Sequence, residues 1–107
     1  MAEIIDKQII EIVNKYIAEV KKHYTISYVF LFGSFAKGTT HKDSDIDIAI
    51  VVSGINDTYQ ERLNMMRLRW DVDLRIEPHP ISIDDFKTDA TGLVYEIKQH
   101  GVQLYAA

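Results

Sequence analysis

The sequence predicts a small α+β domain, in which helices pack on one face of a mixed β-sheet and the other face stays open. Apolar stretches with the two-residue period of strands lie at 26–32, 45–52 and 71–77. Stretches with the period or the caps of helices lie between them, as in a layered domain. At 107 residues, 47% of them hydrophobic, the chain has the length of one domain with a real core, so we expect a single domain over residues 1–107.

The first helix is expected over residues 4–22, because its apolar side chains follow the i, i+4, i+7, i+8 spacing of an amphipathic helix. A cap at 56–57 opens a second helix that runs to about residue 70. A short capped turn or helix, a last helix and a short edge strand then follow at 82–86, 88–100 and 102–105. One face of the second helix is apolar at i, i+4, i+7 and i+11, and we expect it to pack in the core: Tyr59, Leu63, Met66 and Trp70.

The most informative stretch joins the first two strands. An apolar strand runs into Gly33-Ser34, ten residues follow, and Asp45-Ile46-Asp47 opens the next strand. Because alternate residues of a strand face opposite sides, Asp45 and Asp47 share one face, about 7 Å apart along the strand. Two such carboxylates repel each other unless a cation lies between them, and Mg²⁺ prefers oxygen ligands of this kind. The sequence therefore predicts a divalent metal site at the start of this strand.

Gly33 and Ser34 predict an anion site beside the carboxylates. Glycine lets the backbone approach a bound group closely, and a helical turn beginning at Ser34 offers free amide hydrogens and a hydroxyl to phosphate oxygens. Lys37 is a further candidate for a phosphate contact, with a plain surface lysine as the alternative. A nucleoside triphosphate could then lie between this cradle and the two acids, with its phosphates bridged by metal.

The third strand carries more acidic residues. It is expected to end at Pro78 and Pro80, and its apolar residues at 72, 74 and 76 point to the core. The opposite face, which should be the open face of the first two acids, then carries a mixed set of charges: Asp71, Asp73, Arg75 and Glu77. Strand register is not fixed by the sequence, so the alignment of this set with the metal site is open.

The glycine-serine pair, the ten-residue spacer and the D-x-D pair resemble the GSx10DxD signature of the polymerase-β-like nucleotidyltransferase superfamily, and the short chain is similar to its minimal nucleotidyltransferase members. The resemblance implies transfer of a nucleoside monophosphate, AMP from ATP first among the triphosphates, onto a hydroxyl group, with two Mg²⁺ ions. It implies that Asp45, Asp47 and a third strand carboxylate hold the metal and act in catalysis. Asp73 is our choice for the third position, and Asp71 is the alternative.

The partners follow from charge and from the resemblance. A net charge of −4 argues against binding long nucleic acid. The chain contains no cysteine, secretory signal or membrane-spanning apolar run, so we expect a cytoplasmic protein. Minimal members of the superfamily pair with small helical HEPN-type toxins, which implies a hetero-oligomer in which this chain is an antitoxin that adenylylates a tyrosine of the toxin. A non-catalytic antitoxin that binds nucleotide and neutralises its partner by contact, and a small-molecule nucleotidyltransferase of the antibiotic-modifying kind, are the alternatives.

Overall fold

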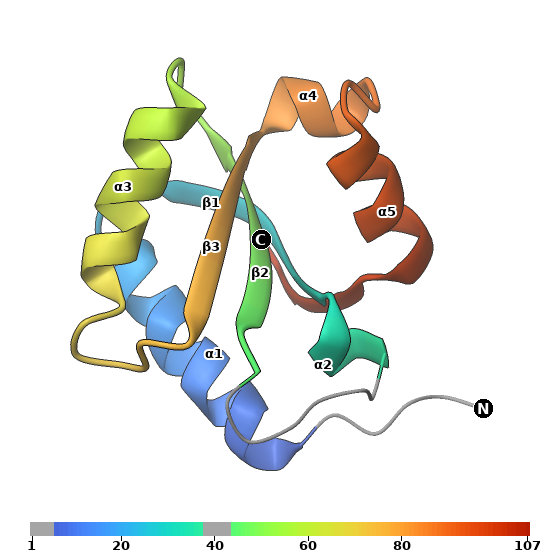
Figure 1. The fold of residues 1–107 in the computed structure, drawn as a ribbon. Coiled ribbons are helices and arrows are strands. Elements are labelled where there is room, and N and C mark those ends of the chain that lie inside the picture. The colour runs from blue at the N-terminus through green and yellow to red at the C-terminus, as the bar shows by residue number, and fades with distance from the viewer. Residues whose placement is uncertain (1–5, 38–43) are drawn as a thin grey trace.

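The computed structural model describes residues 6–37 and 44–107, which form a four-stranded sheet with helices (Figure 1). The strands are β1 (Thr25–Phe32), β2 (Ile46–Ser53), β3 (Ile76–Ser82) and β4 (Val102–Ala106), in the order β3-β2-β1-β4. β1 pairs antiparallel with both β2 and β4, while β2 and β3 are parallel. The predicted α+β class with a mixed sheet is therefore confirmed.

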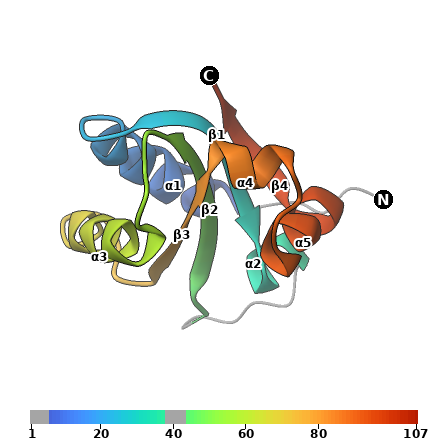
Figure 2. The ribbon, with the colours of Figure 1, turned by 90° about the horizontal axis from the view of Figure 1, so that it is seen from above.

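The helices are α1 (Lys7–Val20), α2 (Ser34–Lys37), α3 (Thr58–Leu68), α4 (Ile83–Lys87) and α5 (Gly92–His100). α1 and α3 cover one face of the sheet, and α4 and α5 lie on the other (Figure 2). This differs from the expected single covered face, because Phe30, Val51 and Ile81 make the second face apolar over part of its length and need cover there. In the described part of the chain, none of these helices has the length and apolar character that crossing a bilayer requires.

α1 packs as its sequence predicts. The Asp6 carboxylate caps it by accepting a hydrogen bond from the amide of Gln8 at 2.8 Å. Five side chains on one face are buried against the sheet: Ile9, Val13, Tyr16, Ile17 and Val20. Tyr16 has no exposed surface, and its hydroxyl donates to the carbonyl of Met65 in α3 at 2.6 Å. This buried bond ties the two helices of this face together.

The third strand begins five residues later than expected, at Ile76, and runs through both prolines, so the predicted strand at 71–77 is wrong. β3 is an edge strand. The Arg75 carbonyl faces β2, where it accepts from the Ile46 amide at 2.8 Å, so the alternate residues Pro78 and Pro80 turn their backbone nitrogens to the free edge. A proline is tolerated there because no ladder hydrogen bond is lost.

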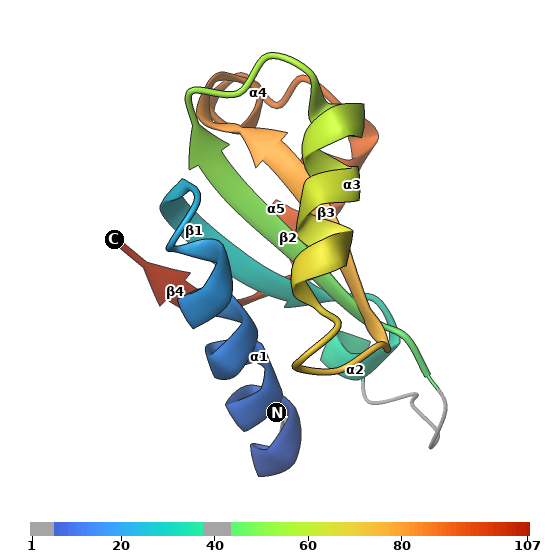
Figure 3. The same cartoon turned by 90° about the vertical axis from the view of Figure 1, so that its left-hand side faces the viewer.

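α3 is rotated relative to the expectation, and the predicted core face of this helix is wrong. Tyr59 and Trp70 are 73% and 71% exposed and Leu63 is 37% exposed, whereas Met65 is the fully buried residue. The free edge of β3 accounts for the rotation (Figure 3). Its carbonyls need donors, and α3 and the residue after it supply them: Arg62 Nε donates to the Pro78 carbonyl at 3.2 Å and Arg69 Nη1 to the Ile76 carbonyl at 2.8 Å.

Candidate functional site

Gly33 and Asp47 meet where β1 ends and β2 begins, beside α2 (Figure 1). Phe32 and Asp47 are opposite each other in the antiparallel ladder. Gly33 has a φ of +72°, and a Cβ atom on it would lie 2.5 Å from Asp47 Oδ2. Any side chain at residue 33 would therefore displace this carboxylate, and the left-handed backbone there favours glycine.

The phosphate-cradle residues are placed in part. Ser34 is the first residue of α2, so the helical turn expected after Gly33 is present. Asp45 precedes β2 and is exposed. The side chain of Lys37 lies outside the described residues, so its predicted phosphate contact stays a prediction. The turn and the acid pair thus flank one end of the β1–β2 pair, as the sequence predicts.

Two residues that were not chosen as site residues lie beside Asp47, although the sequence places one of them, Glu77, on the same open face. Glu77 is its partner in the parallel ladder of β2 and β3, on the same face of the sheet. His79, two residues further along β3, has its Nε2 atom 3.4 Å from Asp47 Oδ1 and packs edge-on against the Phe32 ring at 5.1 Å between centroids. The side chains of Asp47, Glu77 and His79 are 29%, 27% and 26% exposed, so solvent and ligands reach all three.

Asp73 lies in the connection between α3 and β3. It was chosen as the third carboxylate because a strand was expected at 71–77, and it is not part of the observed strand. Its carboxylate accepts from the Arg75 backbone amide at 2.8 Å and from the Arg75 guanidinium at 3.1 and 2.9 Å. The side-chain hydrogen bonds from Arg75 lower the pKa of Asp73, outweighing the opposing effect of its partial burial. Asp73 therefore fastens the turn that leads into β3, and its predicted metal-binding role is untested. The alternative, Asp71, is exposed in the same connection.

The Asp73–Arg75 interaction makes a pH-dependent contribution to stability. Because the folded state lowers the pKa of Asp73 below its ordinary 3.8, the contribution is complete above 3.8 and is lost as pH falls below 3.8 through the lowered pKa of the folded state. We expect Asp73→Asn to lower the free energy of unfolding by about 1–2 kcal/mol at neutral pH. Urea unfolding of both proteins between pH 7 and pH 3 checks this. A difference that stays constant over the range would contradict the assignment.

The two acids at the start of β2 are of the ligand type that a divalent ion prefers. In the described residues, no three acidic or histidine side chains converge on one point. Glu77 is also engaged, since Arg62 Nη2 and Arg69 Nη1 each lie 3.5 Å from one of its oxygens. Asp45 and Asp47 would thus supply the first protein ligands, in keeping with Mg²⁺, which takes few carboxylates and completes its shell with phosphates and water.

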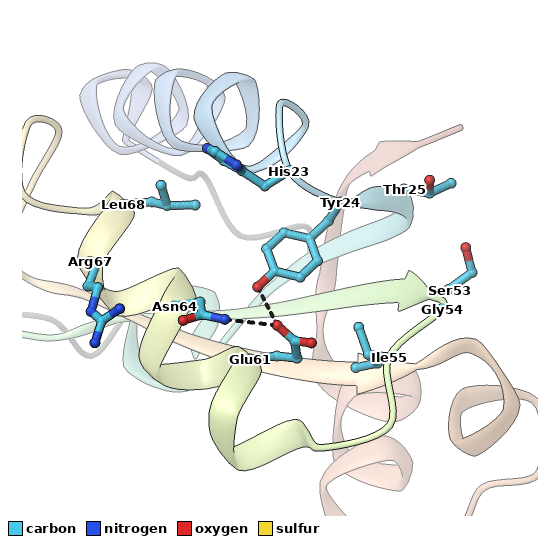
Figure 4. Close-up of a pocket in the computed structure, with 10 residues that line it drawn as sticks. All are labelled: His23, Tyr24, Thr25, Ser53, Gly54, Ile55, Glu61, Asn64, Arg67 and Leu68. Carbon is cyan, nitrogen blue, oxygen red and sulfur yellow. Dashed lines mark hydrogen bonds between the residues drawn. The ribbon is translucent and has the colours of Figure 1, made fainter.

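A pocket of about 490 Å³ lies at the other end of the same strands, where β1 begins and β2 ends (Figure 4). At its centre Glu61 Oε1 accepts hydrogen bonds from the Tyr24 hydroxyl at 2.6 Å and from Asn64 Nδ2 at 3.1 Å. Burial and the bond to Glu61 raise the pKa of Tyr24 to about 12. None of the predicted site residues lines this pocket. The acid pair therefore lies elsewhere, at the opposite end of the strands.

Fold and site together define a class of protein. A mixed sheet with a glycine-serine turn at the end of one strand, and an acid pair at the start of its neighbour, is the arrangement of a nucleotidyl-transfer domain. The chain belongs to the polymerase beta nucleotidyltransferase family, whose family model matches residues 7–107. The resemblance drawn from the signature is therefore confirmed.

The relatives of the chain include a protein adenylyltransferase and proteins solved as toxin–antitoxin complexes. The chain is 26% identical over 83 residues to the protein adenylyltransferase MntA of Shewanella oneidensis, a match over 75% of this chain and 54% of MntA, so it spans about half the length of that relative. A crystal structure of a toxin–antitoxin with AMP-PNP is 26% identical, with a TM-score of 0.66 over 88% of this chain and 73% of that one. A structure of a tri-AMPylated S. oneidensis HEPN toxin with its MNT antitoxin is 20% identical, with a TM-score of 0.58 over 91% and 71%, and supports the fold.

Proposed function

We propose that this protein is a Mg²⁺-dependent adenylyltransferase that moves AMP from ATP onto a tyrosine hydroxyl of a helical HEPN-type toxin and so acts as its antitoxin. The observation that carries the proposal is the close approach of Gly33 to Asp47, which joins the phosphate-binding turn to the acid pair. The MntA relative supports the adenylyl group and the protein acceptor. The AMP-PNP and HEPN structures support the nucleotide and the partner.

In the proposed reaction, the acceptor tyrosine oxygen attacks the α-phosphorus of ATP, and the bond between that phosphorus and the pyrophosphate oxygen breaks. The proton of the tyrosine hydroxyl passes to a carboxylate of the acid site. Ser34 and the amides of its turn hold phosphate oxygens. Asp45 and Asp47 would hold the metal, which when bound offsets phosphate charge and lowers the pKa of the incoming hydroxyl. Most of the rate then comes from positioning and from electrostatic stabilisation of the transferred group.

Glu77 is the best placed third carboxylate, because it is opposite Asp47 in the sheet, whereas Asp73 lies in the connection before β3. We expect Glu77→Gln to lower the rate of AMP transfer by roughly 10- to 100-fold, the range for groups that support a metal site, and to raise the Mg²⁺ concentration needed for half the maximal rate. If Glu77 is the third carboxylate, Asp73→Asn should change the rate of AMP transfer and the required Mg²⁺ concentration by no more than about threefold. Rates measured across a Mg²⁺ titration compare the two variants, and a larger loss for Asp73→Asn would return the role to that residue.

The position of a radiolabel tests the reaction itself. The protein is incubated with Mg²⁺, the HEPN-type protein of the same genome and ATP labelled at either the α- or the γ-phosphate. Adenylyl transfer puts α-label on the partner and releases γ-label as pyrophosphate, whereas a kinase would do the reverse. Partner binding without either label would favour the non-catalytic antitoxin. Transfer to an aminoglycoside and not to the protein would favour the small-molecule enzyme.

A further inference from the structure

α3 lies at the outside of the molecule (Figures 1 and 3). Along α3 and the turn that follows it runs an apolar row in which Tyr59, Leu63 and Trp70 are exposed and Met66 is partly buried. We call it the α3 stripe, and its members are Tyr59, Leu63, Met66 and Trp70. The interior contacts of α3 fix this orientation. Met65 is buried, its carbonyl accepts from Tyr16, and Arg62 and Arg69 are bonded to the edge of β3. The stripe therefore cannot turn inward without breaking several hydrogen bonds.

The composition of this surface is that of a protein interface. Tyrosine, tryptophan, methionine and arginine are the residues enriched at the centres of interfaces. All four arginines of this chain lie between residues 62 and 75, although the net charge is −4. Two of them, Arg62 and Arg67, flank the stripe, one on each side, as their helical positions require. Two of the four arginines of the chain thus lie beside its most exposed aromatic side chains.

The stripe is large enough to form the apolar centre of a protein interface. With aromatic side chains of 150–250 Å² exposed by nearly three quarters, it offers roughly 400 Å² of apolar surface, above what scattered residues give. A standard stable interface buries about 800 Å² on each partner. Since somewhat more than half of such an interface is apolar, the stripe supplies most of the apolar area that one side of it needs.

Charge and spacing define the partner. The i, i+4, i+7, i+11 spacing forms a ridge that packs into the groove of another helix. If two copies of this chain paired stripe against stripe about a twofold axis, an arginine on the flank of one stripe would face an arginine on the flank of the other. The two positive charges would repel each other. A helical partner with carboxylates beside an apolar groove instead complements Arg62 and Arg67.

The stripe is continuous with the acid site. Arg62 and Arg69 link α3 to Glu77, the ladder partner of Asp47. A shallow hollow of about 260 Å³ joins the start of α3 to β3 and is lined by Tyr59, Arg62 and His79 among others. Since His79 lies 3.4 Å from Asp47, a protein seated on the stripe lies alongside the acid site.

We propose that the α3 stripe is the docking surface for the acceptor protein, a helical protein that presents an apolar groove flanked by acidic side chains. The proposal rests on the proposed function for the identity of that protein as the HEPN-type partner. Docking along α3 would hold the acceptor beside Asp47 and Glu77 without any added acceptor-binding domain in the described residues.

The test measures binding separately from transfer. The HEPN-type protein of the same genome is titrated against the wild-type chain and two variants, Tyr59→Ala/Trp70→Ala and Arg67→Glu, by isothermal calorimetry without ATP. We expect the double variant to bind at least about 30-fold more weakly, the loss typical of interface hot spots, and Arg67→Glu at least about fivefold more weakly. Tyr95→Ala is the matched control and should bind like wild type, because Tyr95 is 63% exposed on α5, and α5 lies on the other side of the molecule from α3 (Figure 1).

Each outcome decides the proposal. Equal binding by the wild type and the stripe variants, or no binding by the wild type, overturns it. Sedimentation equilibrium of the chain alone tests the other occupant: a dimer that the double variant abolishes assigns the stripe to a second copy and also overturns it. Stripe-dependent binding with no label transferred supports the docking surface while rejecting the proposed reaction. Urea unfolding confirms that these exposed substitutions leave the fold intact.

Discussion

Asp47→Asn is expected to reduce AMP transfer by about 10³-fold while leaving the fold intact. The substitution keeps the shape of the side chain, so the space beside Gly33 and the contact with His79 persist. It removes the negative charge that holds a divalent ion next to the triphosphate, and losses of 10²- to 10³-fold are typical when one stabilising group of a transition state is removed. Initial rates of α-label transfer at saturating Mg²⁺ measure the effect.

The control for this experiment is Asp84→Asn, which removes one exposed carboxylate in α4, away from the site. It should transfer AMP like wild type, which separates the loss of a ligand from the loss of one charge. Nucleotide binding with and without EDTA adds a second readout, because Asp47→Asn should lose the part of ATP affinity that depends on metal. A variant that keeps more than a tenth of wild-type activity would exclude Asp47 as a metal ligand.

The parts of the site that the sequence predicts are those formed by neighbours in the chain. Gly33 and Asp47 meet because β1 and β2 are consecutive antiparallel strands, so the contact is encoded by the spacing between two short segments. The caps behave in the same way: Asp57 caps α3 and Ser82 caps α4 through hydrogen bonds to residues three positions ahead. Such interactions depend on local order alone and are readable from the residues.

The parts that were missed depend on how distant segments pack. The alternation of acids at 71–77 suits a strand, and nothing local shows that the ladder starts at Ile76 and so pairs Glu77 with Asp47. Arg62 and Arg69 turn toward β3 because they donate hydrogen bonds to the free carbonyls at its edge. The sequence of α3 by itself gives no indication of these acceptors. Helical spacing identifies an apolar face, but the neighbouring strand decides whether that face is buried.

Gly33→Ala is expected to reduce transfer by about 10²-fold with only a small loss of stability, because the added methyl group displaces a flexible carboxylate and not the backbone. A Cβ atom 2.5 Å from Asp47 Oδ2 forces that side chain to rotate, and Asp47 is partly exposed and free to do so. The site loses its geometry, and misplacing a catalytic group by about 1 Å can cost 10²-fold. The left-handed backbone adds a strain of about 1–2 kcal/mol for any side chain at this position.

Gly54→Ala separates these two effects. Gly54 has nearly the same backbone conformation, with a φ of +75°, but its Cβ would meet nothing within 4 Å. Both alanine variants should therefore lose similar stability in urea, while only Gly33→Ala loses transfer. In an Asp47→Asn background, Gly33→Ala should reduce the residual rate by less than about threefold, because two changes that act through one carboxylate are not additive. Independent, multiplicative losses would mean that Gly33 serves the phosphates directly and not the position of Asp47.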